Sequence, residues 1–175
     1  EKVAYEATRH LITLGHTKIA LVTGPMEEDC SQDRTEGYQR ALQEAGIAFD
    51  KTMVIEGDWS ASSGQSALLS FVEQGRVPSA VFAQNDRMAM GVLRAARDIN
   101  LKVPSQLAVI GVDDMPLSSY FDPPLTTMRQ DMPRIGQEAT RMLLDIIKKK
   151  STAMRDLKLP AELVIRWSTS EKGGD

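Results

Sequence analysis

Four side chains suited to holding a polyhydroxylated small molecule each follow a short apolar run of this sequence: Arg34, Trp59, Asn85 and Asp113. An arginine and an aspartate can grip vicinal hydroxyls with charge-assisted hydrogen bonds, and an asparagine can both donate to and accept from one hydroxyl. A tryptophan ring covers an apolar face of C–H groups at a small cost in conformational entropy. The residue types therefore predict a site for a sugar-like ligand.

Each of these residues also has a purely structural interpretation. Asn85 and the next residue, Asp86, are placed to cap a helix, and capping is the favoured interpretation of Asp86. Asp113 and Asp114 suit a turn. The arginine would be a solvated side chain on a first helical turn, although the helix dipole disfavours a cation there. The tryptophan would be a surface or interface aromatic.

The segments that must position these side chains alternate between strand-like and helical patterns. The apolar runs typical of strands are residues 18–23, 53–56, 80–83, 107–112 and 125–129. Helical spacing of apolar residues covers 1–14, 32–45, 60–73, 86–98 and 132–149. Two further short strands are expected near 156–159 and 162–167. This alternation predicts βαβ units in a three-layer α/β sandwich with a mainly parallel, doubly wound sheet.

The parallel arrangement also predicts where the four side chains lie. Ligands of open parallel sheets bind just beyond the carboxyl ends of the strands. Four successive strands deliver the arginine, tryptophan, asparagine and first aspartate to that one edge, so we expect them to converge there.

Composition argues against several other classes of protein. The chain has 175 residues, 42% of them hydrophobic, and a formal net charge of −3, which is unlike a free-standing nucleic-acid binder. No apolar run approaches the length of a membrane span. The single cysteine, Cys30, permits no intrachain disulfide and indicates a reducing compartment. The only histidines, His10 and His16, have no nucleophile beside them in a recognisable motif and no metal-ligand spacing. The sequence also contains no phosphate-binding loop motif. We therefore expect a protein that is not an enzyme and that binds no cofactor or metal.

Several motifs recur together in one known family. They are LGHTKIALVTGP at 14–25, RTEGY at 34–38, EGDWS at 56–60, NDRMAMG at 85–91, VIGVDD at 109–114 and PPLTT at 123–127. In this order and at these spacings they resemble the LacI/GalR transcription regulators. The resemblance covers essentially the whole chain.

This resemblance implies a division of the chain within a periplasmic-binding-protein type I core, whose two lobes are crossed three times by the backbone. Residues 1–128 would form the C-terminal lobe, and 129–153 the hinge and a helix belonging to the N-terminal lobe. Residues 154–170 would return as strands, and 171–175 would be a disordered tail. The rest of the N-terminal lobe and a helix-turn-helix would lie outside this sequence.

The resemblance also implies roles for individual residues. The family positions that face the effector fall on the same four residues that the strand ends indicate, with Gln130 and Met132 bordering the pocket near the hinge. Trp59 and Asn85 favour a lactose-type over a purine-type sensor, hence a glycoside or disaccharide effector. Cys30 would lie in a loop at the pocket edge.

Three functions are compared on this basis. The first is a cytoplasmic sensor that forms a homodimer or higher oligomer. In it, a sugar controls the binding of operator DNA by the helix-turn-helix that would lie outside this sequence. Tyr120 and Phe121 are candidate interface residues, with packing under the proline loop as the alternative. The second function is a periplasmic sugar-binding protein of a transport system, and the third is an enzyme of flavodoxin-like architecture. Which sugar binds, and whether it induces or co-represses, stay open.

Overall fold

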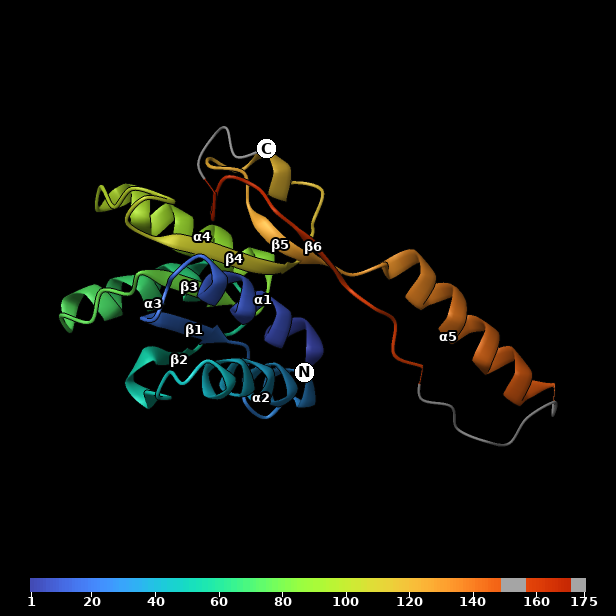
Figure 1. The fold of residues 1–175 in the computed structure, drawn as a ribbon. Helices are drawn as coiled ribbons and strands as arrows, with labels where there is room; N and C mark the ends of the chain where they lie inside the picture. Colours follow the sequence, from blue (N-terminus) through green and yellow to red (C-terminus); the bar gives the residue numbers. More distant parts are fainter. Residues whose placement is uncertain (149–156, 171–175) are drawn as a thin grey trace.

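The computed structural model describes residues 1–148 and 157–170, which form a six-stranded sheet flanked by helices (Figure 1). The strands are β1 (Ile19–Thr23), β2 (Val54–Glu56), β3 (Ala80–Ala83), β4 (Ala108–Asp113), β5 (Thr126–Arg129) and β6 (Glu162–Val164). The α-helices are α1 (Lys2–Thr13), α2 (Asp29–Glu44), α3 (Ala61–Glu73), α4 (Asp86–Asp98) and α5 (Met132–Ile147). Short 3-10 turns occupy Lys51–Met53 and Ser118–Tyr120.

The strand order β2-β1-β3-β4-β5-β6 gives the doubly wound topology that the sequence predicts. The pairs from β2 through β5 are parallel, and β6 alone runs antiparallel, with Thr127 opposite Val164. The chain leaves β1 in one direction to β2 and then returns past it to β3. The β1–β3 boundary is therefore a topological switch point, where open α/β sheets form a ligand crevice.

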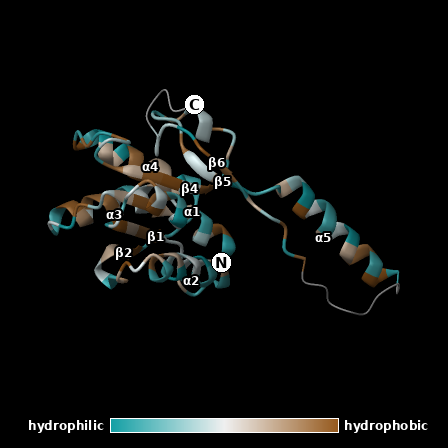
Figure 2. Ribbon diagram, viewed as in Figure 1, coloured by the Kyte–Doolittle hydropathy of each residue, from teal (hydrophilic) through white to brown (hydrophobic). Residues whose placement is uncertain are grey.

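The core is split between the two faces of the sheet, because successive strand residues point to opposite sides. Ala20 and Val22 pack with α3 and α4, whereas Ile19 and Leu21 pack with α1 and α2. Strands β1 and β3 are buried at every position, as expected for a sheet that helices cover on both sides. Figure 2 shows the apolar colour concentrated in these central strands. The predicted three-layer α/β sandwich is thus confirmed.

Helix α5 differs from the other helices because none of its residues is buried. It extends from the carboxyl end of β5, away from the sheet (Figure 1). The face that it leaves open is apolar, with Leu143 58% and Ile147 64% exposed. Its N-cap is conventional, since the Asp131 carboxylate accepts from the Arg134 backbone N–H at 3.0 Å.

Two expectations about elements need correction. Residues 157–159 are irregular, so the strand expected near 156–159 is absent from the described part of the chain. Pro160, which has no backbone N–H to give to a ladder, follows directly. Helix α2 begins at Asp29, three residues before its expected start. The expected disordered tail, 171–175, lies outside the described residues.

Candidate functional site

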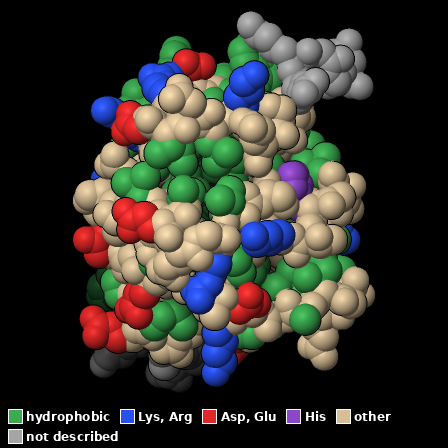
Figure 3. Space-filling model, turned by 90° about the vertical axis from the view of Figure 1, so that its left-hand side faces the viewer, with side chains coloured by type: hydrophobic (Ala, Val, Ile, Leu, Met, Phe, Trp, Pro, Cys, Tyr) green, Lys and Arg blue, Asp and Glu red, His purple; other side chains and the backbone are tan. Residues whose placement is uncertain are grey.

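The carboxyl edge of the parallel strands brings the predicted site residues into one neighbourhood. Thr23, Glu56, Ala83 and Asp113 end β1, β2, β3 and β4, and the loops that follow lie on the side from which α5 departs (Figure 1). The opposite edge, which faces the viewer in Figure 3, mixes apolar and charged side chains on an outer surface. The site is built from the carboxyl-edge loops and the helix starts behind them.

Arg34 stands on the second turn of α2 and reaches across to the end of β3. Its Nη1 donates to the Gln84 carbonyl oxygen at 2.7 Å, and its guanidinium lies 5.7 Å from the centroid of the Trp59 ring. That distance is within the range of a cation–π interaction. The cation is therefore partly buried and anchored to the sheet edge. It is not the freely solvated side chain that the structural interpretation of the sequence expected.

Trp59 is fixed by three separate contacts. Its Nε1–H donates to Glu28 Oε1 at 3.0 Å, its carbonyl accepts from Asn85 Nδ2 at 3.1 Å, and Arg34 lies over its ring. The residue adopts φ +68°, a left-handed conformation that a bulky side chain rarely takes. The ring lies directly against Gly24, where an added Cβ would be 2.0 Å from a ring carbon. A glycine at this position is thus what lets the ring reach the site.

Asn85 is mainly a structural link, and it is 8% exposed. Its Oδ1 accepts from the Met88 backbone N–H at 2.8 Å as the N-cap of α4, while its Nδ2 holds Trp59. The capping interpretation is confirmed for Asn85 and wrong for Asp86, which is buried in the first turn and accepts from other elements instead.

Asp113 ends β4 with φ +119°, and its Oδ1 accepts from Gln130 Nε2 at 2.9 Å. Burial raises the pKa of Asp113, and the Arg34 guanidinium opposes that rise. Asp113 thus ends β4, the strand next to β3, whose following residue Gln84 accepts from Arg34. The structure joins Arg34, Trp59 and Asn85 by direct contacts and places Asp113 at the end of the adjacent strand.

Asp114 has a structural role in the turn after β4, as the turn interpretation of that residue predicts. Its carboxylate forms ion pairs at 2.7 Å with both Arg129 and Arg166. Burial raises its pKa, but the hydrogen bonds and charges of the two arginines outweigh this and leave the pKa below its ordinary value. The ion pairs join β4, β5 and the segment after β6.

Gln130 and Met132 border an open groove of about 670 Å³ between the sheet edge and the start of α5. Asp113 and Leu159 line the same groove. Met132 is 58% exposed, so it offers an apolar contact surface to anything that enters. The structure thus places both residues beside Asp113, and their contact with an effector stays a prediction.

Two positioning residues were not predicted. Gln84 is fully buried, and its side chain accepts from the Gly24 backbone N–H and donates to the Ser31 carbonyl, both at 3.1 Å. Glu28 holds the indole of Trp59. A polar residue directly after a buried strand was an available signal for Gln84, whereas a contact across 31 positions gave none for Glu28.

The remaining candidates lie at two different places. Cys30 is exposed on the first turn of α2, so it belongs to a helix and not to the expected pocket-edge loop. Tyr120 is 82% exposed, and Phe121 is partly buried against the core behind it. Both line a hollow of about 280 Å³ beside α4. The packing interpretation suits Phe121, and an interface role for Tyr120 stays a prediction.

Taken with the topology, this geometry defines an α/β domain with a parallel, doubly wound sheet, the class of fold in which ligand sites lie at the switch point of the sheet. Residues 8–169 match the family described as the periplasmic binding protein-like domain. The chain belongs to that family, and its resemblance to the LacI/GalR regulators is confirmed by the relatives and structures that it matches.

Two of the curated relatives that the chain matches are repressors. The HTH-type transcriptional repressor PurR of Vibrio atlanticus (strain LGP32) is 38% identical over 166 residues, which are 95% of this chain and 50% of the repressor. That of Aliivibrio fischeri (strain ATCC 700601 / ES114) is 37% identical over 174 residues, 98% of this chain and 52% of the repressor. The chain spans about half the length of the curated relatives it matches.

Solved structures agree with this assignment. A complex of the transcriptional regulator CelR with cellobiose has a TM-score of 0.92 at 34% identity, over 95% of this chain and 51% of that one. The Lac repressor bound to ONPG in its repressed state has a TM-score of 0.89 at 35% identity, over 96% and 50% of the two chains. The names of these structures describe transcription regulators and not enzymes. Among the described helices, none has the length and hydropathy that a membrane crossing requires.

Proposed function

We propose that this chain is the effector-binding part of a LacI/GalR-type transcription regulator and that its effector is a sugar, a glycoside or a disaccharide. The ligand would bind at the sheet edge, in contact with Arg34, Trp59 and Asp113 and bordered by Gln130 and Met132. Asn85, the fourth residue of the site, would act chiefly by holding Trp59. The observation that carries the proposal is that the Arg34 guanidinium lies over the Trp59 indole at the end of β3, with the Asp113 carboxylate at the end of the adjacent strand β4.

The chemistry of the cluster suits a sugar. Arg34 and Asp113 can hold adjacent hydroxyls by donating and accepting charge-assisted hydrogen bonds. The partly exposed indole can cover the C–H face of a pyranose ring. Likeness to a regulator solved with cellobiose supports the same ligand class. The curated relatives carry the name PurR, so a purine is the second candidate effector, and the experiment below includes it.

The proposal extends to the arrangement of the whole protein. Residues 1–128 would form one lobe, 129–153 a hinge and a helix of the other lobe, and 154–170 the return to the first. Residues 149–156 of this division lie outside the described residues. The exposed apolar face of α5 supports this division, because the half of the relatives' length that this chain does not span would be long enough to supply a lobe that covers it. The intact protein would be a cytoplasmic homodimer or higher oligomer, with Tyr120 and Phe121 at the interface.

Control of DNA would follow from linkage between two sites. Operator DNA would be bound by a helix-turn-helix in the part of the protein outside this chain, and the sugar would change its affinity by favouring one lobe arrangement. The two affinities must then be coupled reciprocally. The repressor names of the relatives favour this function over that of a periplasmic transport protein.

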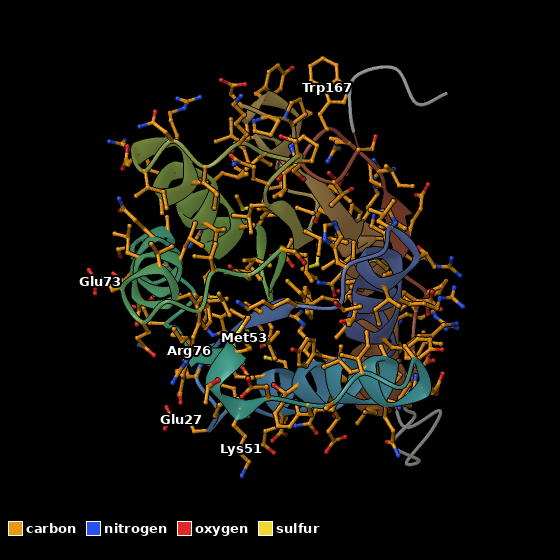
Figure 4. The ribbon with its side chains drawn as sticks, turned by 60° about the vertical axis from the view of Figure 1, so that its left-hand side comes forward. Glu27, Lys51, Met53, Glu73, Arg76 and Trp167 are labelled. Atoms are coloured by element: carbon orange, nitrogen blue, oxygen red, sulfur yellow. The ribbon has the colours of Figure 1, made fainter. Side chains whose placement is uncertain are left out.

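The experiment is a titration of the intact protein with cellobiose, other glycosides, free hexoses and pentoses, and purines, followed by calorimetry and by operator binding. A saturable heat with one sugar, reduced at least tenfold in affinity by Trp59→Phe or Asp113→Ala, would support the proposal. Trp167→Phe is the matched control, because the residue after Trp167, Ser168, accepts from the Val109 N–H near the amino end of β4, whereas Trp59 follows the carboxyl end of β2. Figure 4 shows Trp167 well separated from Met53, the residue that precedes β2.

Two results would contradict the proposal in different ways. Saturation by a purine and by no sugar would keep the regulator and replace its ligand. Sugar binding that leaves operator affinity unchanged would keep the ligand and remove the regulatory function, since a ligand without differential affinity shifts no equilibrium.

A further inference from the structure

Asp86 is a buried carboxylate that the site described so far does not use. It lies in the first turn of α4, one residue after Asn85, and is fully buried. Burying a carboxylate costs free energy unless hydrogen bonds compensate for the lost water. Its partners therefore show what this position is built to hold.

Three groups from three different segments donate to this one carboxylate. The Thr127 hydroxyl of β5 donates to Oδ1 at 2.6 Å. The Ser118 hydroxyl donates to Oδ2 at 2.5 Å, and the Met115 backbone N–H donates to the same oxygen at 2.9 Å. The carboxylate also lies against the backbone of β4, because a Cβ on Gly111 would be 2.3 Å from Oδ1. Asp86 thus ties the start of α4 to the end of β4, to β5 and to the turn between them.

The turn between β4 and β5 needs such support. Asp113 and Asp114 have φ +119° and +55°, so two successive residues with side chains adopt conformations that usually require glycine. Such a backbone persists only where its surroundings hold it. The Asp114 N–H donates to the Thr127 hydroxyl at 3.3 Å, and that hydroxyl donates in turn to Asp86. Asp86 therefore holds the Met115 amide directly and the Asp114 amide through Thr127.

We propose that Asp86 is a positioning residue for the effector site, which keeps the Asp113 carboxylate at the sheet edge by fixing the two amides that follow it. An ionised carboxylate only accepts hydrogen bonds, so it orients all three donors toward itself. An asparagine of the same shape would turn an N–H₂ group toward at least one of them and break the arrangement. The link to ligand affinity rests on the proposed function, whereas the link to the turn does not.

The first experiment therefore needs no effector. Amide hydrogen exchange of the intact protein is compared between wild type and Asp86→Asn. We expect the amides of Asp114 and Met115 to exchange at least about tenfold faster in the variant. Asp98→Asn, at the exposed far end of the same helix, removes the same charge and should leave both amides within about twofold of wild type. Thr127→Val should accelerate exchange at Asp114 alone, and Thr127→Ser should restore it.

The second experiment measures affinity for cellobiose by calorimetry on the same proteins. We expect Asp86→Asn to weaken binding about tenfold in the wild-type background and less than about twofold in the Asp113→Ala background, because its effect passes through Asp113. A defect in stability alone would not produce this non-additivity in the folded protein.

The outcomes separate the two proposals. Unchanged exchange at both amides in Asp86→Asn, or equal losses of cellobiose affinity in both backgrounds, would overturn the positioning role. If no sugar binds the wild type, the sugar proposal fails, and amide exchange alone decides the role of Asp86. If Asp86→Asn does not fold, Thr127→Val tests the same amide, and wild-type exchange there would refute the inference.

Discussion

Replacing Gly24 by alanine should dislodge the Trp59 ring from the site. The new Cβ would lie 2.0 to 2.3 Å from three ring atoms, whereas carbon atoms in contact stay about 3.5–4.0 Å apart, so the ring must move by more than about 1 Å. Such a shift breaks the 3.0 Å hydrogen bond to Glu28 and the contact with Arg34. The hydrogen bond contributes about 0.5–1.5 kcal/mol and the cation–π contact about 0.5–1 kcal/mol at such partly exposed positions.

We therefore expect the free energy of unfolding to fall by about 1–2.5 kcal/mol and the Tm by about 2–10 °C, measured by thermal and urea denaturation. In a Trp167→Phe background, the emission of Trp59 should also shift to longer wavelength as the ring leaves its contacts. Gly136→Ala is the control, since an added Cβ there meets no atom within 4 Å and alanine favours the helix. Wild-type stability and emission in Gly24→Ala would refute the packing argument for Trp59.

Three further predictions concern other parts of the molecule. The two arginines lower the pKa of Asp114, so its carboxylate stabilises the fold above the ordinary pKa of about 3.9, and this contribution is lost as the pH falls. The difference in urea midpoint between wild type and Asp114→Asn should therefore be smaller at about pH 3 than at about pH 6. Leu143→Ala should cost about 2–5 kcal/mol in urea unfolding of the intact protein, where the other lobe covers it, and close to nothing in this chain alone; equal costs would contradict the lobe assignment. Tyr120→Asp should weaken self-association at least about tenfold, measured by sedimentation. It should not lower the Tm extrapolated to the monomer, because the Tyr120 side chain is 82% exposed. An unchanged dimer would exclude this surface as the interface.

The central elements could be predicted because their signals are local. Strand β3 and helix α4 begin and end at the predicted residues, since a continuous apolar run gives way to a capping asparagine and then to helical spacing. The boundaries shift where the signal is tertiary. Helix α2 gains its first turn from residues 29–31, whose polar side chains show no helical periodicity. The expected strand before Pro160 fails because no neighbouring strand is there to pair with it.

The site was predictable as a set of positions but not as a set of contacts. Strand ends place Arg34, Trp59 and Asp113 at one edge whatever their partners are. The bond from Trp59 to Glu28 depends on how two loops fold toward each other, which no spacing in the sequence encodes. The same limit explains the wrong interpretation of Asp86, because a cap and a buried acceptor have the same sequence pattern at a helix start.

The start of α4 connects the two halves of the site. Asn85 reaches Trp59 on one side with its Nδ2, and Asp86 reaches the turn after Asp113 on the other through Thr127 and Met115. The N-cap and the first helical residue are adjacent in the chain, so we expect a displacement of the indole by a ligand to be transmitted through the helix start to the aspartate turn. Trp59→Phe and Asp113→Ala, which are far apart in the chain, should therefore show a coupling of at least about 0.5 kcal/mol in a double-mutant cycle of sugar affinity. Strict additivity of the two losses would show that the halves of the site act separately and that the helix start is only a cap.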